Sequence, residues 1–153
     1  MNDLCVGIDL GTTNSVLATI NEKPNGDIVS KVVEISRAVD MYNAVSGEAK
    51  LTTMKKPTLP SCVYYRQEKN YEPLVGDFAK MQYPLRPHLV AKSIKSQMGR
   101  SPAEGLSPDI PDKTPAEISA RILKHLLREA SKIYRCDIKD AVITVPANFD
   151  SAM

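Results

Sequence analysis

The apolar positions of the N-terminal part of the chain form three short runs, Leu4–Leu10, Ser15–Ile20 and Ile28–Ile35. A small polar segment, Gly11–Asn14, separates the first two runs, and Pro24–Asp27 separates the second from the third. Short apolar or alternating runs are typical of β-strands, and Pro-Asn-Gly-Asp is typical of a turn. Because both connections are tight, the pattern predicts three consecutive antiparallel strands that form a meander.

The region from residue 37 to residue 113 has a less regular pattern, which proline repeatedly interrupts. Its apolar runs predict a short strand at 59–65, the end of a hairpin partner at 73–76, short helices at 77–82 and 87–98, and a loop at 101–113. Proline disfavours long helices and central strands. We therefore interpret residues 37–113 as an insertion that forms a small α+β subdomain.

The clearest element begins at Thr114, where Thr-Pro-Ala-Glu combines a capping box with proline at the first helical position. Apolar residues at helical spacing follow: Ile118, Ile122, Leu126, Ala130 and Ile133. This stripe predicts a helix that ends near Tyr134 or Arg135. Asp140–Val145 then predicts a buried strand, which Pro146 ends.

The order of elements is three strands, an inserted region, a long helix and a fourth strand. A helix between two strands can cross over so that the last strand lies parallel beside the first. The order predicts an α/β fold, most of a ribonuclease-H-like half-domain with a mixed sheet. We assign residues 1–36 and 114–153 to this core and residues 37–113 to the inserted subdomain. The half-domain is incomplete, because the usual second helix and fifth strand have no counterpart.

Composition narrows the possible partners and compartments. The chain has 153 residues and a formal net charge of +2, which gives no electrostatic argument for nucleic-acid binding. Its apolar runs are too short to cross a bilayer, and its first residues lack the features of a signal peptide. The cysteines have no metal-binding spacing, and we expect Cys5 and Cys62 to be small core residues of a cytoplasmic protein.

The segment from Val6 to Ser15 carries the candidate chemistry. An apolar strand ends at Asp9 and is followed by Gly11, Thr12 and Thr13. Glycine lets the backbone approach a ligand, and the hydroxyl groups can donate to an anion such as phosphate. A carboxylate at the strand end can hold a hydrated Mg²⁺ ion. On its own, the segment fits an ordinary hairpin turn equally well.

Motifs in separate parts of the chain resemble those of the heat-shock-seventy (DnaK-type) chaperones. Gly7–Ser15 is similar to the first phosphate motif of that family, and Ala141–Phe149 is similar to its Val-Thr-Val-Pro-Ala-x-Phe segment. Ile94–Arg100 is similar to the family's Lys-x-x-x-Gly-Arg segment. Leu59–Ser61 and Val75–Lys80 also match, in the same order. The resemblance therefore covers essentially the whole chain and implies an actin-like ATPase fold.

Some positions depart from the family pattern. Leu59 stands where threonine is usual, Asn148 replaces an aromatic residue, and Ser96 replaces a basic residue. The segment 37–56 is longer than the family leads us to expect. These departures indicate a divergent member of the family.

The resemblance implies an ATP-binding, ATP-hydrolysing chaperone that assists protein folding. The implied phosphate-binding residues are Gly11, Thr12, Thr13 and Asn14. The implied catalytic residues are Asp9, which would hold Mg²⁺ through water, and Lys95, which would place the attacking water. Pro146 matches the position thought to relay the state of the nucleotide to the substrate domain.

The family also implies cofactors and partners. The cofactors are ATP or ADP with Mg²⁺, and the partners are unfolded client peptides, a J-domain co-chaperone and a nucleotide-exchange factor. Two alternatives stay open at this point: a sugar-kinase-like enzyme of the actin-like ATPase superfamily, and a non-catalytic nucleotide-sensing relative. Because the last strand would lack a neighbour on one side, we also expect a dimer through residues 140–153.

The chain alone should bind ATP weakly or not at all and should show no meaningful ATPase activity. The family's nucleotide-binding domain is at least about twice this length, and its second phosphate motif and adenosine pocket have no counterpart here. Each charge-assisted contact that is missing costs about 1.5–3 kcal/mol. Calorimetric titration checks this expectation, and an affinity for ATP in the micromolar range would contradict it.

Overall fold

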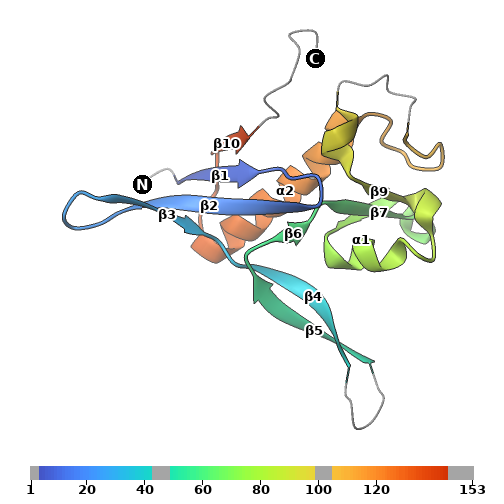
Figure 1. Cartoon of the computed structure of the whole chain (residues 1–153), viewed down its shortest axis with the longest axis horizontal. Helices are drawn as coiled ribbons and strands as arrows, with labels where there is room; N and C mark the ends of the chain where they lie inside the picture. The colour runs from blue at the N-terminus through green and yellow to red at the C-terminus, as the bar shows by residue number, and fades with distance from the viewer. Residues whose placement is uncertain (1–3, 43–48, 99–104, 145–153) are drawn as a thin grey trace.

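A mixed sheet of five strands is the largest sheet of the structure, which is a computed structural model that describes residues 4–42, 49–98 and 105–144 (Figure 1). Four strands follow the order β10 (Asp140–Thr144), β1 (Cys5–Asp9), β2 (Asn14–Glu22) and β3 (Ile28–Val32). β10 is parallel to β1, whereas β2 is antiparallel to both of its neighbours, β1 and β3. The predicted meander and the parallel return of the last strand are therefore confirmed.

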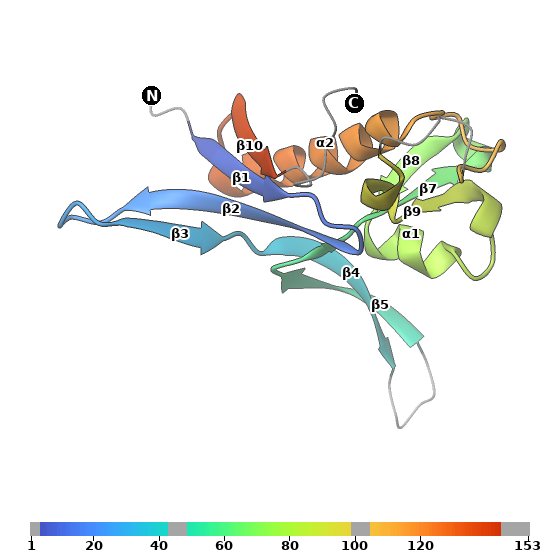
Figure 2. The same cartoon turned by 45° about the horizontal axis from the view of Figure 1, so that its top comes forward.

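The region between β3 and the long helix forms two further sheets. β4 (Ile35–Tyr42) and β5 (Ala49–Lys56) make a hairpin that extends away from the main sheet (Figure 2). β8 (Glu72–Val75), β7 (Cys62–Arg66) and β9 (Val90–Lys92) make a three-stranded sheet with β7 in the centre. Helix α1 (Asp77–Gln82) follows β8, and short 3₁₀ turns occur at Gln67–Lys69, Pro87–Leu89 and Ile94–Gln97. The strand β6 (Leu59–Pro60) joins this region to the main sheet by pairing with β2.

Helix α2 (Pro115–Tyr134) begins and ends as its sequence predicts. The Thr114 hydroxyl accepts a hydrogen bond from the Glu117 backbone N–H, and the Glu117 carboxylate accepts one from the Thr114 N–H. The helix ends at Tyr134, and the capping residue Arg135 after it has a left-handed φ of 54°. Its apolar stripe shares one buried cluster with Val6, Ile8 and Leu17 of the main sheet. This packing holds α2 against the sheet, as Figures 1 and 2 show.

Two of the elements that the sequence predicts differ from the structure. The run Ile28–Ile35 is not one strand, because β3 ends at Val32 and Ile35 begins β4. The helix expected at 87–98 is wrong, since Val90–Lys92 form β9 and pair with Cys62–Tyr64. β7 has an edge that needs hydrogen-bond partners, and the β-branched Val90 favours an extended backbone there.

The burial of two segments also differs from expectation. Cys62 is buried as expected, but Cys5, the first residue of β1, is exposed. β10 is not a buried strand: its Val142 and Ile143 side chains are 67% and 41% exposed. Within the described residues β10 pairs only with β1, so it lies at an edge of the sheet. Residues 145–153, the remainder of the segment expected to dimerise, lie outside the described part of the chain.

A polar network around the buried carboxylate of Asp112 links the loop before α2 to both the helix and β7. The Tyr65 hydroxyl donates to Asp112 Oδ2 over 2.7 Å, and Arg121 donates to both Asp112 oxygens over 2.8 Å. Tyr65 is fully buried, and Asp112 is 6% exposed. The hydrogen bonds from Arg121, and then from Tyr65, lower the pKa of Asp112 below its ordinary value. Its ionised form is thus favoured in the folded state.

Replacing Asp112 by asparagine should destabilise the protein at neutral pH by about 1–3 kcal/mol, because Arg121 and Tyr65 lose a charged acceptor. A lowered folded-state pKa contributes stability above the carboxyl's ordinary pKa of about 4, and this stability is lost as the pH falls through the folded-state value. The difference between wild type and Asp112→Asn should therefore shrink below about pH 4. Urea unfolding at pH 7 and pH 3 measures it. The exposed neighbour Asp109 supplies a control, Asp109→Asn, and a pH-independent loss in Asp112→Asn would contradict the assignment.

Candidate functional site

The turn between β1 and β2 requires glycine at its first position. A Cβ atom built on Gly11 would lie 2.1 Å from the carbonyl oxygen of Asn14, which is far inside van der Waals contact. The missing side chain therefore lets the turn close on itself. Thr12, Thr13 and Asn14 follow at its exposed tip, where their polar groups are accessible.

Strand β6 holds this turn in place from the other side. The Ser61 N–H donates to the carbonyl oxygen of Thr13 over 2.9 Å, next to the pairing of Asn14 with Pro60. Directly beneath, the hydroxyl oxygens of Ser15 and Ser61 lie 2.9 Å apart and are buried. A buried hydroxyl pair is favourable only when both groups keep their partner. The backbone of the turn is therefore fixed, whereas its tip is open to solvent.

A carboxylate and an amine from distant parts of the chain meet beside the turn. Asp9 ends β1, and its Oδ1 lies 3.8 Å from Nζ of Lys95, which belongs to the 3₁₀ turn after β9. Thr144, the last residue of β10, donates its hydroxyl to the same Oδ1 over 2.5 Å. The Asp9 side chain is still 60% exposed, and that of Lys95 is 21% exposed. Both groups can thus reach a ligand without breaking a buried contact.

This arrangement suits a hydrated divalent cation next to an anion. Mg²⁺ keeps several water molecules and uses one or two carboxylates, and Asp9 offers such a carboxylate. Across residues 4–42, 49–98 and 105–144, histidine, cysteine, aspartate and glutamate form no group of three or more that could hold a metal ion directly. The closure of the turn at Gly11 and the hydroxyls of Thr12 and Thr13 fit a phosphate group. The residues present therefore fit a phosphate with a water-mediated cation.

The structure brings together most of the residues singled out in the sequence. Asp9, Lys95 and the turn Gly11–Asn14 all lie near the end of β1, whereas Pro146 lies outside the described residues. Sequence reasoning missed Thr144. A usable signal existed, because the parallel register that pairs Asp9 with Thr144 follows from aligning the ends of the first and last predicted strands.

The chain is similar to known proteins over almost its whole length. Residues 107–153 match the model of the family described as Hsp70 protein. The chain is 39% identical over 150 residues to the chaperone protein DnaK of Thermotoga neapolitana, covering 98% of this chain and 21% of that protein. It is 40% identical over 151 residues to the chaperone protein DnaK of Mesomycoplasma hyopneumoniae, covering 98% of this chain and 20% of that protein. The chain belongs to the Hsp70 family.

Membership of the Hsp70 family bears on both the fold and the function of the chain. It implies an actin-like ATPase fold, with which the mixed α/β structure and its several sheets are consistent. It also favours the chaperone interpretation over the sugar-kinase alternative, since the relatives are chaperone proteins.

The chain spans about one fifth of the length of these relatives. None of the helices in the described part of this Hsp70-family chain has both the length and the apolar character that a membrane crossing requires.

Substituting alanine for Gly11 should destabilise the protein by about 1–3 kcal/mol, because the new methyl group displaces the Asn14 carbonyl and strains the turn. Gly7, in β1, is a matched control: a Cβ atom there would lie 3.9 Å from the Ala18 carbonyl oxygen, an ordinary contact. Gly7→Ala should leave stability unchanged or raise it by up to about 1 kcal/mol. Urea unfolding of both variants checks this, and equal effects would show that the turn does not need glycine.

Proposed function

We propose that this chain supplies the phosphate- and magnesium-facing wall of the nucleotide site in an ATP-hydrolysing Hsp70 chaperone. The observation that carries the proposal is the approach of Lys95 Nζ to Asp9 Oδ1 at 3.8 Å, beside the closed turn at Gly11. The ammonium group of Lys95 thus meets a carboxylate and a closed polar turn that come from a distant part of the sequence. A turn that only reversed the chain would need neither of the two charged groups.

The turn would bind the phosphates of ATP or ADP. Gly11 allows the turn to close, and Thr12, Thr13 and Asn14 offer backbone and side-chain donors at an exposed tip. Phosphoryl transfer depends on positioning and on neutralising charge more than on covalent chemistry by the protein. Fixed donors aimed at phosphate oxygens serve that purpose, because they need no rearrangement as the charge develops.

Asp9 and Lys95 would act on the same phosphate group through opposite charges. Asp9 would hold the water shell of Mg²⁺, with Thr144 keeping one carboxylate oxygen in a fixed orientation. Lys95 would place the attacking water and offset negative charge, which suits the compact charge of an ammonium group. A Mg²⁺ ion held through water by Asp9 would supply positive charge to the phosphate oxygens.

The same proposal covers the division of the chain into a core and an inserted subdomain, the role of Pro146 and the partners. Residues 1–36 and 114–153 would form the core of the first lobe, and residues 37–113 the inserted subdomain that carries Lys95. The separate sheet β8–β7–β9 and its own small core cluster support this division. Pro146 would relay the nucleotide state to a substrate domain. The partners would be unfolded peptides, a J-domain co-chaperone and a nucleotide-exchange factor in the cytoplasm.

The test uses a chimera of the DnaK protein of Thermotoga maritima, in which this chain replaces the equivalent first fifth. The two sequences are 40% identical over 151 residues. The chimera should hydrolyse ATP, and Lys95→Ala should lower kcat by about 10²–10³-fold, the range for loss of one donor that stabilises developing charge. Nucleotide binding should change little, because the interaction is made mainly in the transition state. Steady-state ATPase assays and binding of a fluorescent nucleotide measure the two quantities.

Lys92→Ala is the matched control for this experiment. Lys92 lies on the neighbouring strand β9, and its Nζ sits 3.6 Å from the centroid of the Tyr83 ring, away from Asp9. It should hydrolyse ATP like the parent chimera. Equal activity of the Lys92 and Lys95 variants would contradict the role of Lys95. A folded chimera that binds ATP but does not hydrolyse it would favour the non-catalytic alternative.

A further inference from the structure

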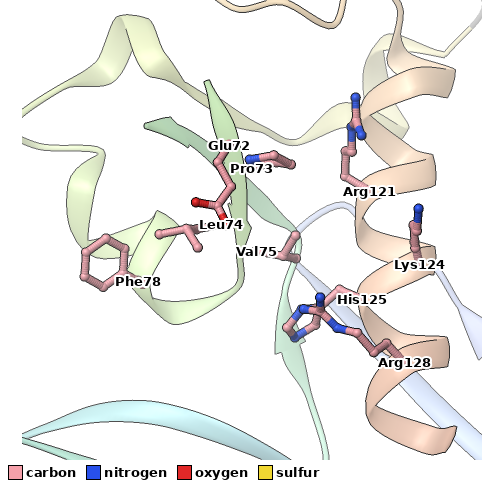
Figure 3. Close-up of a pocket in the computed structure, with 9 residues that line it drawn as sticks. All are labelled: Glu72, Pro73, Leu74, Val75, Phe78, Arg121, Lys124, His125 and Arg128. Atoms are coloured by element: carbon pink, nitrogen blue, oxygen red, sulfur yellow. The ribbon is translucent and has the colours of Figure 1, made fainter. Parts of the chain in front are cut away.

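A groove of about 510 Å³ runs between α2 and β8, the edge strand of the three-stranded sheet (Figure 3). Neither Asp9 nor the Gly11 turn belongs to its lining. One wall is the strand β8 with Phe78 of α1, and the other is the exposed side of α2. Figure 3 shows Pro73 and Val75 on the side of β8 that faces α2, and Leu74 and Phe78 on the opposite side. The groove therefore meets the edge of β8 and both of its faces.

The backbone at this edge is available for pairing. Within the described residues β8 pairs only with β7. The Gly76 N–H donates to the Cys62 carbonyl oxygen over 3.0 Å, and residues alternate between inward and outward hydrogen bonding along an antiparallel strand. Leu74 therefore directs its backbone groups to β7, whereas Val75 and Pro73 direct theirs outward. Proline at 73 costs the β7–β8 ladder no hydrogen bond.

The opposite wall carries cations that lack acidic partners. Lys124 and Arg128 are exposed and lie one helical turn apart, and in the described part of the chain neither forms a salt bridge. Like charges at this spacing repel each other. Burial lowers the pKa of His125 between them, so this imidazole is neutral at pH 7 and leaves the two cations as the charge of this wall.

Glu72, which lines the groove, and two acidic groups that interact with its lining residues Arg121 and His125 already have cationic partners. Glu72, at its rim, pairs with Arg66, and Asp112 accepts both hydrogen bonds of Arg121. Glu129 of α2 pairs with Lys132 on the same helix. The groove thus has a strand edge, a half-buried apolar side and an uncompensated positive side.

We propose that this groove binds an extended acidic peptide, which adds as a strand to the free edge of β8. The Val75 N–H and C=O and the Pro73 C=O would supply the main-chain hydrogen bonds, as in other cases of strand addition. Side chains of an extended peptide alternate between the two faces of a sheet. Acidic side chains on one face would meet Lys124 and Arg128, and apolar side chains on the other would meet Leu74 and Phe78.

The test uses the full chain and a fluorescent eight-residue peptide in which glutamate alternates with valine. It should bind, and a peptide with lysine in place of glutamate should not. Lys124→Gln combined with Arg128→Gln should weaken binding of the acidic peptide at least about tenfold, because the loss of one charge-assisted contact raises the dissociation constant by about that factor. The control combines Lys23→Gln with Lys31→Gln, which removes the same charge from the distant β2–β3 hairpin and should leave binding unchanged.

Modified probes separate strand addition from simple charge attraction. N-methylation of alternate peptide residues removes the N–H groups of one edge at a time, so one methylated peptide should lose binding and the other should retain it. Fluorescence anisotropy measures all probes at the same salt concentration. The proposal would be overturned if the two methylated peptides bound equally well. It would also be overturned if the lysine peptide, or a single-stranded oligonucleotide of matched charge, bound as well as the acidic peptide. An unchanged affinity of the acidic peptide for the Lys124/Arg128 variant would overturn it too.

Discussion

The burial of one face of α2 against the main sheet determines where most other parts of the structure lie. Ile118, Ile122, Leu126 and Ala130 are at most 1% exposed. Fully burying side chains of this size contributes about 1.5–3 kcal/mol for each large one, before the cost in entropy. Because the helix is anchored in this way, the chain that leaves it returns beside β1 and forms β10 in parallel. The opposite face of the same helix supplies the cationic wall of the groove.

Sequence patterns predicted the elements whose signals are local and strong. The capping box at Thr114 and the helical stripe gave the limits of α2, and the tight turns gave the meander. The pattern around Val90 was weaker, because a short apolar run fits a helix or a strand equally well until a neighbouring strand offers an edge. Cys5 was misplaced for a similar reason: the first residue of a strand can face solvent even when the strand reads as apolar throughout.

The candidate site was predictable only in part. Asp9 and the Gly11 turn follow directly from a strand that ends in a small polar segment, and their chemistry can be read from residue types. No spacing or periodicity brings Lys95 to Asp9, so that meeting depended on the family resemblance. Thr144 was missed because its contact becomes visible only when the ends of the first and last predicted strands are aligned in parallel, a step beyond the local pattern of either strand.

The hydrogen bond from Thr144 to Asp9 joins residues 135 positions apart. Contacts between such distant positions form slowly, because the chain must lose the entropy of closing a long loop before they stabilise it. The Gly11 turn, by contrast, needs only its neighbouring strands. During folding, the turn can therefore take shape early, while the carboxylate beside it acquires its orientation only when nearly the whole chain has come together. The orientation of the Asp9 carboxylate therefore depends on a contact that forms late in folding.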